Sequence, residues 1–293
     1  MDYGLILPSL GAGASREAIE AACEAAERHG FRDVWVTDHL LVDASAKDDY
    51  GRIYEAVATL AWVAGRFRRV RVGASVIVVP MRNAVVLAKE LATIDDLSGG
   101  RLTVGVGAGW SEVEFRNVGV DERFKVRGAY LEETVRLFRH LWSGSREPFA
   151  GRFHSFEDFE FEPLPAQGAA LPIWIGGRNE KALARAGRMA DVYHASASRP
   201  SAVAERIPVI RAAAEAVGRP MPGLSARVRV ELDGPPADAF YAMRGTPEEI
   251  AAEIRAYAEV GVGHLALAFR EREPGAITAE IDRFVADVLP LVP

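Results

Sequence analysis

Short apolar, β-branched runs alternate with longer amphipathic segments along this chain, and this alternation limits the fold more than any single motif. The runs predict eight strands, near residues 2–8, 33–37, 71–79, 102–107, 172–176, 190–194, 224–231 and 263–269. The intervening segments have helical periodicity, with apolar faces formed by Leu87, Leu91 and Ile94 and by Leu131, Val135, Phe138 and Trp142. Regular alternation of this kind is typical of parallel strands in an α/β fold.

Helix boundary signals agree with this layout. Thr246-Pro247-Glu248-Glu249 combines a capping threonine, a proline at the first helical position and a glutamate that completes a capping box. Ser15 is placed to cap the first helix, and Gly30 to end it before the second strand. Because the alternation continues without a break, we expect residues 1–293 to form a single (β/α)8 TIM barrel rather than an open doubly wound sheet.

Residues 145–170 interrupt the alternation. They are rich in Phe, Glu, Gly and Pro and are too long for a simple helix-to-strand turn, so we expect an insertion with a short hairpin. The phenylalanines at 149, 153, 156 and 159 suggest an apolar lid or a group packed on the barrel, and we favour packing.

Composition and charge exclude several classes of protein. A net charge of −6 argues against a protein that coats nucleic acid or an anionic membrane, so we expect a small-molecule partner. The single cysteine, Cys23, lies on the apolar side of the first helix and is expected to be a packed core thiol. The chain enters a strand with no basic and long apolar leader before it, which favours a cytoplasmic location.

Asp38 and His39 follow the second strand and are the first catalytic candidates. Side chains at the carboxyl ends of barrel strands stand at the mouth, where such barrels carry out chemistry. Histidine titrates near neutrality, so His39 is suited to give or take a proton, with Asp38 orienting it or binding a ligand. The alternative is a structural histidine satisfied by neighbouring backbone.

A second candidate is the turn Ile175-Gly176-Gly177-Arg178-Asn179, which lies between a strand and a helix. Glycines let backbone amides approach a ligand, and the helix N-terminus together with Arg178 favours a phosphate. A plain tight turn is the alternative.

The Gly-rich segment Val104–Trp110 lacks the glycine spacing of a dinucleotide-binding loop and lies at the fourth strand. We expect its small residues to let a flat ring lie against the backbone, with Trp110 as a wall.

The remaining histidines form no metal-binding signature, and no HExxH, paired CxxC or GxSxG motif occurs, so a metal site or a serine nucleophile is not expected. His194 ends the sixth strand and is a candidate substrate contact at the mouth.

Three segments resemble the bacterial luciferase-like family of flavin and deazaflavin oxidoreductases: VTDHLLV (36–42), VGASVIVVPMRNAVVLAKELATIDDLSGGRLTVGVGAGW (72–110) and IWIGG (173–177). The likeness covers nearly the whole chain and is similar to the branch that uses the deazaflavin coenzyme F420. The resemblance implies a barrel whose mouth holds the tricyclic ring, with the coenzyme phosphate against Gly176, Gly177 and Arg178.

The same resemblance implies roles for other residues. Asp38 would contact the ring system and His39 would serve as acid/base. Ser75-Val76 would form a bulge beneath the ring, through a non-proline cis peptide. Ala108, Gly109 and Trp110 match ring-contact positions, but Trp110 replaces the glutamate of sugar-phosphate dehydrogenase relatives, which argues against sugar phosphate oxidation.

The expected function is hydride transfer between F420 and a small organic substrate. An FMN-dependent monooxygenase that uses reduced flavin and O2 is the alternative; a flavin-binding protein without turnover and a phosphate-substrate isomerase are further ones. Specificity is expected in mouth loops at 40–55, 111–127 and 145–170, and a homodimer is expected by analogy with the family.

Overall fold

The structure, a computed structural model, describes residues 1–46, 50–234 and 241–292. Its barrel strands are β1 (Asp2–Ile6), β2 (Asp33–Val36), β3 (Arg71–Ala74), β4 (Ile77–Val78), β5 (Leu102–Gly107), β8 (Ile173–Gly176), β9 (Val192–Ser196), β10 (Gly223–Leu232) and β12 (Val262–Ala268). Each of the eight predicted runs contains a strand. The third is divided into β3 and β4 at Ser75-Val76, whose peptide bond is cis, as the resemblance implied.

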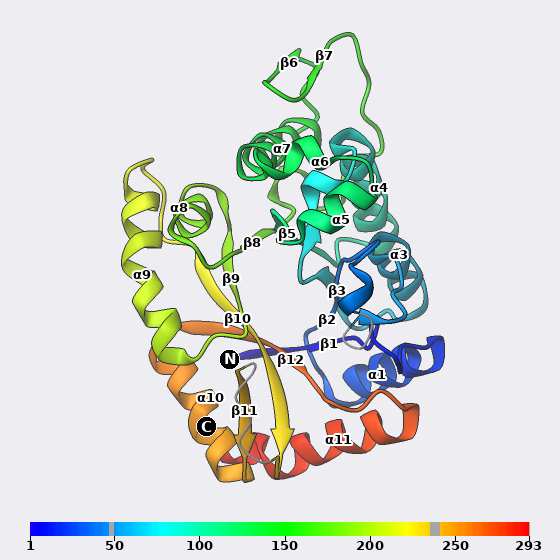
Figure 1. Cartoon of the computed structure of the whole chain (residues 1–293), viewed down its shortest axis with the longest axis vertical. Helices are drawn as coiled ribbons and strands as arrows, with labels where there is room; N and C mark the ends of the chain where they lie inside the picture. The colour runs from blue at the N-terminus through cyan, green and yellow to red at the C-terminus, as the bar shows by residue number, and fades with distance from the viewer. Residues whose placement is uncertain (47–49, 235–240, 293) are drawn as a thin grey trace.

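These strands close into a parallel barrel (Figure 1). Around the barrel the order is β1, β2, β3, β5, β8, β9, β10 and β12; β12 pairs with β1, and β4 pairs with β5. This closure confirms the TIM barrel and excludes the open doubly wound sheet. A further strand, β11 (Ala242–Gly245), pairs in parallel with β10 and was not predicted, because it has no β-branched residue.

Helices surround the barrel: α1 (Arg16–His29), α3 (Ala56–Arg66), α4 (Ala84–Ser98), α5 (Glu112–Asn117), α6 (Asp121–Phe124), α7 (Arg127–Trp142), α8 (Glu180–Met189), α9 (Pro200–Glu215), α10 (Pro247–Glu259) and α11 (Pro274–Asp287). The cap predictions are confirmed. Ser15 accepts a hydrogen bond from the Ala18 amide, Gly30 has a left-handed backbone, and Thr246 forms a complete capping box.

Apolar cores lie on both sides of the barrel wall. The outer core fills the space between strands and helices and contains the predicted helix faces, including the buried Leu91 and Phe138. Cys23 is fully buried in it, and burial raises the pKa of its thiol. A smaller inner core lies within the barrel and consists of Ile6, Trp35, Trp174, Ala266 and Ala268.

The insertion contains the predicted hairpin, formed by β6 (Phe149–Ala150) and β7 (Ser155–Phe156), which lies beside α7 (Figure 1). Phe149 and Phe156 stack with their ring centroids 5.4 Å apart, and the insertion's phenylalanines pack against the outer core. The favoured alternative, packing on the barrel, is therefore confirmed. The C-terminal part of 145–170 lies away from the mouth, whereas its hairpin reaches the starts of α4 and α7, so a role of this segment in specificity stays a prediction. The segment connects α7 to the start of β8, and Gln167 bonds the Leu102 carbonyl where β5 begins.

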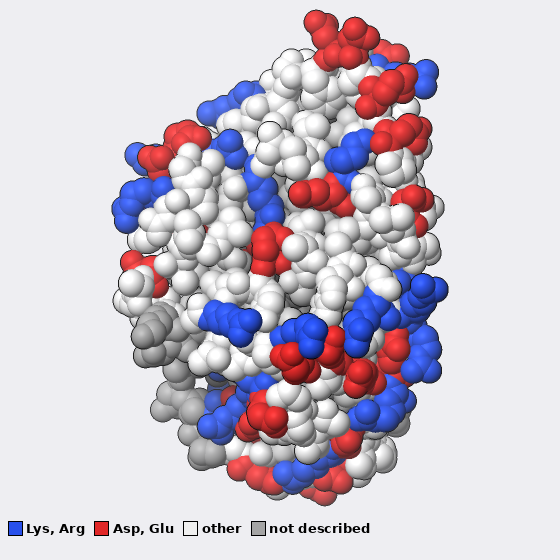
Figure 2. Space-filling model, turned by 90° about the vertical axis from the view of Figure 1, so that its right-hand side faces the viewer, with Lys and Arg blue, Asp and Glu red and all other residues white. Residues whose placement is uncertain are grey.

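On the face shown in Figure 2, Lys and Arg are interspersed with Asp and Glu, and uncharged surface lies between them. The expectation that the partner is neither nucleic acid nor an anionic membrane stays a prediction. Within the described ranges, no helix combines the length and apolar character needed to cross a membrane. The cytoplasmic location stays a prediction.

Candidate cofactor and catalytic site

The predicted site residues converge because the strands that carry them are parallel. Asp38 and His39 follow β2, Ser75 and Val76 separate β3 from β4, Ala108 to Trp110 follow β5, and the Gly176–Arg178 turn ends β8. All of these strands end at the same side of the barrel, so the residues surround its mouth.

Asp38 is a buried carboxylate that organises the mouth. Its Oδ2 accepts hydrogen bonds from the Val78 amide at 2.8 Å and from Arg82 Nε at 3.2 Å, and its Oδ1 accepts one from Arg82 Nη2 at 2.6 Å. Arg82 also donates to Glu55 at 2.6 Å. Burial disfavours the charged guanidinium, but Asp38 and Glu55 outweigh it and raise the pKa of Arg82. Asp38 therefore fixes the bulge segment through Val78, and its predicted contact with a ring stays a prediction.

His39 is paired with a second buried acid that the sequence reasoning missed. Its Nδ1 lies 3.0 Å from Glu114 Oε2, and the other oxygen of Glu114 accepts the Leu40 amide at 2.5 Å. Both side chains are less than 10% exposed. A carboxylate at Nδ1 fixes the tautomer in which Nδ1 carries hydrogen, so Nε2 is the nitrogen that can exchange a proton. Nε2 has no hydrogen-bond partner within the described ranges.

Two aromatic rings enclose His39. Tyr50 packs edge-on at 4.5 Å between ring centroids, and Trp110 lies at 6.1 Å. Trp110 is 62% exposed, which fits the predicted wall at the mouth. The two rings lower solvent access to His39 from the side of the loops that follow β2 and β5.

The glycines of β5 make room for the bulge between β3 and β4. A Cβ on Gly105 would lie 1.8 Å from the Ala74 carbonyl oxygen, and one on Gly107 would lie 2.6 Å from Val76 Cγ2. Both glycines are therefore required by protein packing. The expectation that this strand opens directly to a flat ring needs correction, because the bulge lies against the strand, although Val76 itself is partly exposed.

The turn after β8 is suited to an anion. Gly177 has φ +146°, a conformation that favours glycine, and a Cβ there would meet Ala182 at 2.4 Å. Arg178 is exposed and uses Nε and Nη2 to bond the Ser196 carbonyl, which leaves other guanidinium donors open. Asn179 caps α8, so the turn presents a helix N-terminus and a cation together.

His194 lies below the mouth, inside the barrel. It is 1% exposed, and its ring nitrogens lie 2.9 Å from the hydroxyls of Ser75 and Ser225. Burial lowers the pKa of His194 to about 3, and the charges of His264 and Arg227 add to this effect. This burial contradicts the expectation that His194 reaches substrate.

The contacts of His194 belong to a longer polar chain through the barrel. Ser225 Oγ lies 2.9 Å from His264 Nδ1, and His264 Nε2 lies 2.9 Å from Asp33 Oδ1. The same Asp33 oxygen accepts the Trp35 indole N–H at 2.5 Å. This series, Ser75–His194–Ser225–His264–Asp33, is hereafter the axial chain.

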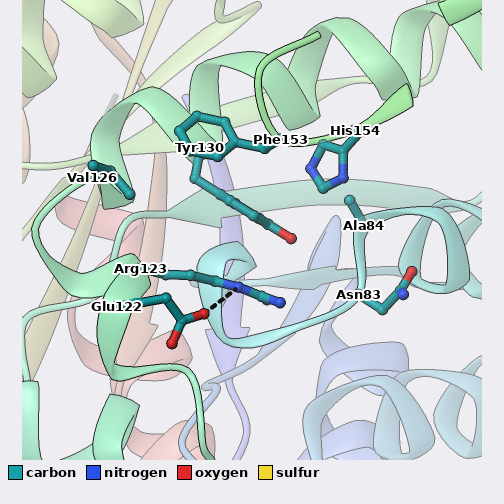
Figure 3. A pocket seen from close by; sticks show the side chains of 8 residues that line it. All are labelled: Asn83, Ala84, Glu122, Arg123, Val126, Tyr130, Phe153 and His154. Carbon is teal, nitrogen blue, oxygen red and sulfur yellow. Dashed lines mark ion pairs between the residues drawn. The ribbon is translucent and has the colours of Figure 1, made fainter. Parts of the chain in front are cut away.

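A separate pocket of about 310 Å³ lies outside the barrel, between the start of α4, α6, α7 and the hairpin (Figure 3). Arg123 lies in it beside Tyr130 and pairs with Glu122 at 3.5 Å. Arg123 also donates to the Arg82 carbonyl, so the pocket supports the turn that carries the partner of Asp38. None of the predicted site residues lines it.

The mouth residues fit a phosphate-bearing tricyclic cofactor. The turn at Gly177 offers the N-terminus of α8 and the exposed Arg178 to an anion, and the bulge offers a partly exposed Val76, which lies near Gly176. These features do not distinguish F420 from FMN, because both carry a phosphate and three fused rings. Among the residues that the structure describes, no cluster of three His, Cys, Asp or Glu is arranged to hold a metal.

Sequence comparison relates the chain to known enzymes. A family model described as luciferase-like monooxygenase matches residues 3–233. An F420-dependent glucose-6-phosphate dehydrogenase from Kineococcus radiotolerans is 27% identical over 314 residues, covering 91% of this chain and 90% of the relative. An FMNH(2)-dependent dimethylsulfone monooxygenase from Pseudomonas putida is 33% identical over 180 residues, covering 59% of this chain and 45% of the relative.

Structural comparison supports the same architecture. The coenzyme F420-dependent tetrahydromethanopterin reductase from Methanopyrus kandleri aligns with a TM-score of 0.81 at 17% identity. The alignment covers 100% of this chain and 99% of the reductase. At this identity the likeness establishes the fold.

Proposed function

The chain belongs to the luciferase-like monooxygenase family and is an enzyme, and from this premise we propose that it transfers a hydride between coenzyme F420 and a small organic substrate. The observation that carries the proposal is the buried pair His39–Glu114 at the mouth to which the anion-suited turn after β8 also belongs. A cofactor that moves a hydride needs a neighbouring group to move the coupled proton, and this pair is suited to that task.

Each residue has a separate task in the proposed reaction. The deazaflavin ring supplies the hydride chemistry when bound. Nε2 of His39 gives or takes the proton, while Glu114 holds the imidazole in the required tautomer. Arg178 and the first turn of α8 bind the phosphate, and Tyr50 and Trp110 limit access of water to His39.

The alternative is an FMN-dependent monooxygenase. The similarity to the FMNH(2)-dependent dimethylsulfone monooxygenase supports it. The same phosphate turn and the same histidine would serve it. The two functions differ in cofactor and in oxygen use, so direct binding separates them.

The test is titration of the purified protein with F420 and with FMN, followed by quenching of each cofactor's fluorescence. Selective F420 binding supports the proposal, selective FMN binding supports the alternative, and binding of neither contradicts both. Arg178→Gln should weaken binding about tenfold, since charge-assisted hydrogen bonds are lost. Arg283→Gln, which breaks exposed ion pairs on α11, is the matched control and should bind as wild type.

His39→Ala separates binding from turnover. We expect the variant to bind the cofactor as wild type and to lose turnover by about 10²–10⁴-fold, the usual contribution of an acid/base group. Glu114→Gln should reduce turnover less and should change its pH profile, because the tautomer is no longer fixed by a charge. Unchanged turnover in His39→Ala would contradict the assigned role.

We propose a homodimer as well. Neighbouring helices α3 and α4 carry exposed apolar side chains, namely Trp62, Val85, Val86 and Leu97. Exposed apolar residues on adjacent helices favour association. Light scattering of wild type and Val86→Lys should show a dimer that weakens in the variant.

A further inference from the structure

Three arginines gather at the mouth, where β9 and β12 end. Arg227 and Arg229 alternate along β10 on the same face as Ser225. The Ser225 hydroxyl bonds histidines inside the barrel, so both arginines point inward, nearer the mouth than Ser225. Arg272 follows β12. Burial, followed by the charge of Arg229, lowers the pKa of Arg227 to about 10, and Arg272 adds to the effect. Positive charge is therefore concentrated on this side of the mouth.

Arg227 has almost none of the partners that other half-buried arginines have. Its single hydrogen bond runs from Nη1 to the Ser75 carbonyl at 2.9 Å, and no carboxylate of the described residues lies within 4.0 Å of it. By contrast, Arg82 pairs with Asp38 and Glu55. Arg101 has no carboxylate either, but it donates to four backbone carbonyls.

The unused donors of Arg227 remain accessible. A guanidinium has five N–H donors, and Arg227 uses one in the described structure. Among the described residues, no nitrogen of Arg227 is both buried and without a hydrogen-bond partner. The nitrogens of Arg227 that make no hydrogen bond are therefore in contact with solvent. Arg272 is similar, because its guanidinium donates from Nη1 to the Phe269 and Glu271 carbonyls.

Arg227 is also close to the candidate reaction centre. Its one bond is to the bulge residue Ser75, and Tyr50, which packs on His39, lies close enough to favour its charge. The guanidinium therefore faces the space framed by the bulge and His39. This position is distinct from the phosphate turn, where Arg178 follows β8.

We propose that Arg227, assisted by Arg272, binds an anionic group of the substrate, so that the substrate is a small organic anion. The inference rests on the proposed function and specifies its substrate class. A planar guanidinium with open donors matches a carboxylate or a phosphate in a two-pronged contact. Such a contact would fix the substrate's reacting carbon relative to His39.

The experiment uses cofactor-free protein, titrated by calorimetry with glutarate, inorganic phosphate and the neutral dimethyl glutarate. We expect an anion to bind and the diester not to bind. Arg227→Gln should weaken anion binding at least tenfold, and Arg227→Lys should weaken it less. Arg178→Gln should leave glutarate binding unchanged. The preference for glutarate or for phosphate is measured in Arg178→Gln, so that the phosphate turn does not contribute, and it identifies which anionic group the Arg227 site takes.

Three outcomes would overturn the proposal: no anion binds wild type, anions bind Arg227→Gln as well as wild type, or Arg227→Gln loses cofactor affinity while keeping anion affinity. The last would show that Arg227 contacts the cofactor ring. If Arg227→Gln does not fold, Arg272→Gln tests the same site, because its contacts are to backbone carbonyls. Failure of the proposed function is seen separately, as absence of F420 and FMN binding to wild type.

Discussion

The two sides of the barrel wall are built from different chemistry. The outer side packs against helices through aliphatic and aromatic residues, as around Leu91 and Phe138. The inner side carries the axial chain, two tryptophans and the inward arginines of β10. A substitution on the outer side should lower stability in proportion to the side-chain volume it removes, whereas each inner polar group depends on specific hydrogen-bond partners. Stability is therefore concentrated outside the wall and function inside it.

The largest effect is expected in the outer core. Phe138 is fully buried and stacks on Trp142 at 4.8 Å. Phe138→Ala should lower the free energy of unfolding by about 3–5 kcal/mol, because it leaves a cavity. Urea denaturation measures this loss, and cofactor affinity of the folded protein should not change. A loss below about 1 kcal/mol would show that the outer core does not dominate stability.

The next effect concerns pH and the inner side. Folding lowers the pKa of His194 to about 3, so the unfolded chain binds the proton first as pH falls. The contribution of His194 is fully present above about pH 6.5 and decreases by about 1.4 kcal/mol for each pH unit between there and pH 3. Denaturation at pH 4.5–7 should show a shallower dependence in His194→Gln than in wild type. Parallel curves for the two proteins would contradict this assignment.

Gly105 tests the contact between the inner strand β5 and the bulge. Gly105→Ala places a methyl group against the Ala74 carbonyl and should cost about 1–3 kcal/mol, with weaker cofactor binding. Gly65→Ala in α3 is the control, since no atom lies within 4 Å of its Cβ and the helix should gain up to about 1 kcal/mol. Thermal denaturation compares them, and equal behaviour would remove the packing argument.

The smallest effect is expected on the outer surface. Thr246 caps α10 by accepting the Glu249 amide, and Thr246→Ala should cost about 1 kcal/mol. Cofactor titration should give the wild-type affinity, because the cap belongs to the outer layer. An altered affinity would show that the two sides of the wall are coupled.

The outer layer could be predicted well because its signal is periodic. The faces of Leu87 and Leu131 follow helical spacing, and every barrel strand overlaps a predicted run. The exception, β11, has the sequence Ala-Met-Arg-Gly and pairs with β10 at the end of the sheet path. A strand without β-branched residues gives no local signal.

The site could be predicted only in part. Asp38, His39 and the Gly176–Arg178 turn were identified because parallel strands end together, and the structure brings them to one mouth. Glu114 was missed because Ser111 and Glu114 match a capping pattern, which suggests a purely local role. Ser111 does cap α5, but the Glu114 carboxylate turns to His39, a neighbour 75 residues earlier.

Arg227 was missed for a related reason. The alternation of Arg227 and Arg229 with Val228 and Val230 is typical of a strand with one polar face, and such faces usually meet solvent. In a closed barrel that face is the interior. His194 was misplaced by the same ambiguity, because the sequence does not show how deep an inward residue lies.

The axial chain also has a consequence for biosynthesis. Its last member, Asp33, is made early, whereas its partner His264 follows 231 residues later, on the final barrel strand. Until that strand emerges from the ribosome, the Asp33 carboxylate and the Trp35 indole lack one side of their enclosure. The nascent chain can assemble most of its outer helices before then, but the interior is completed only by the last strand to be synthesised.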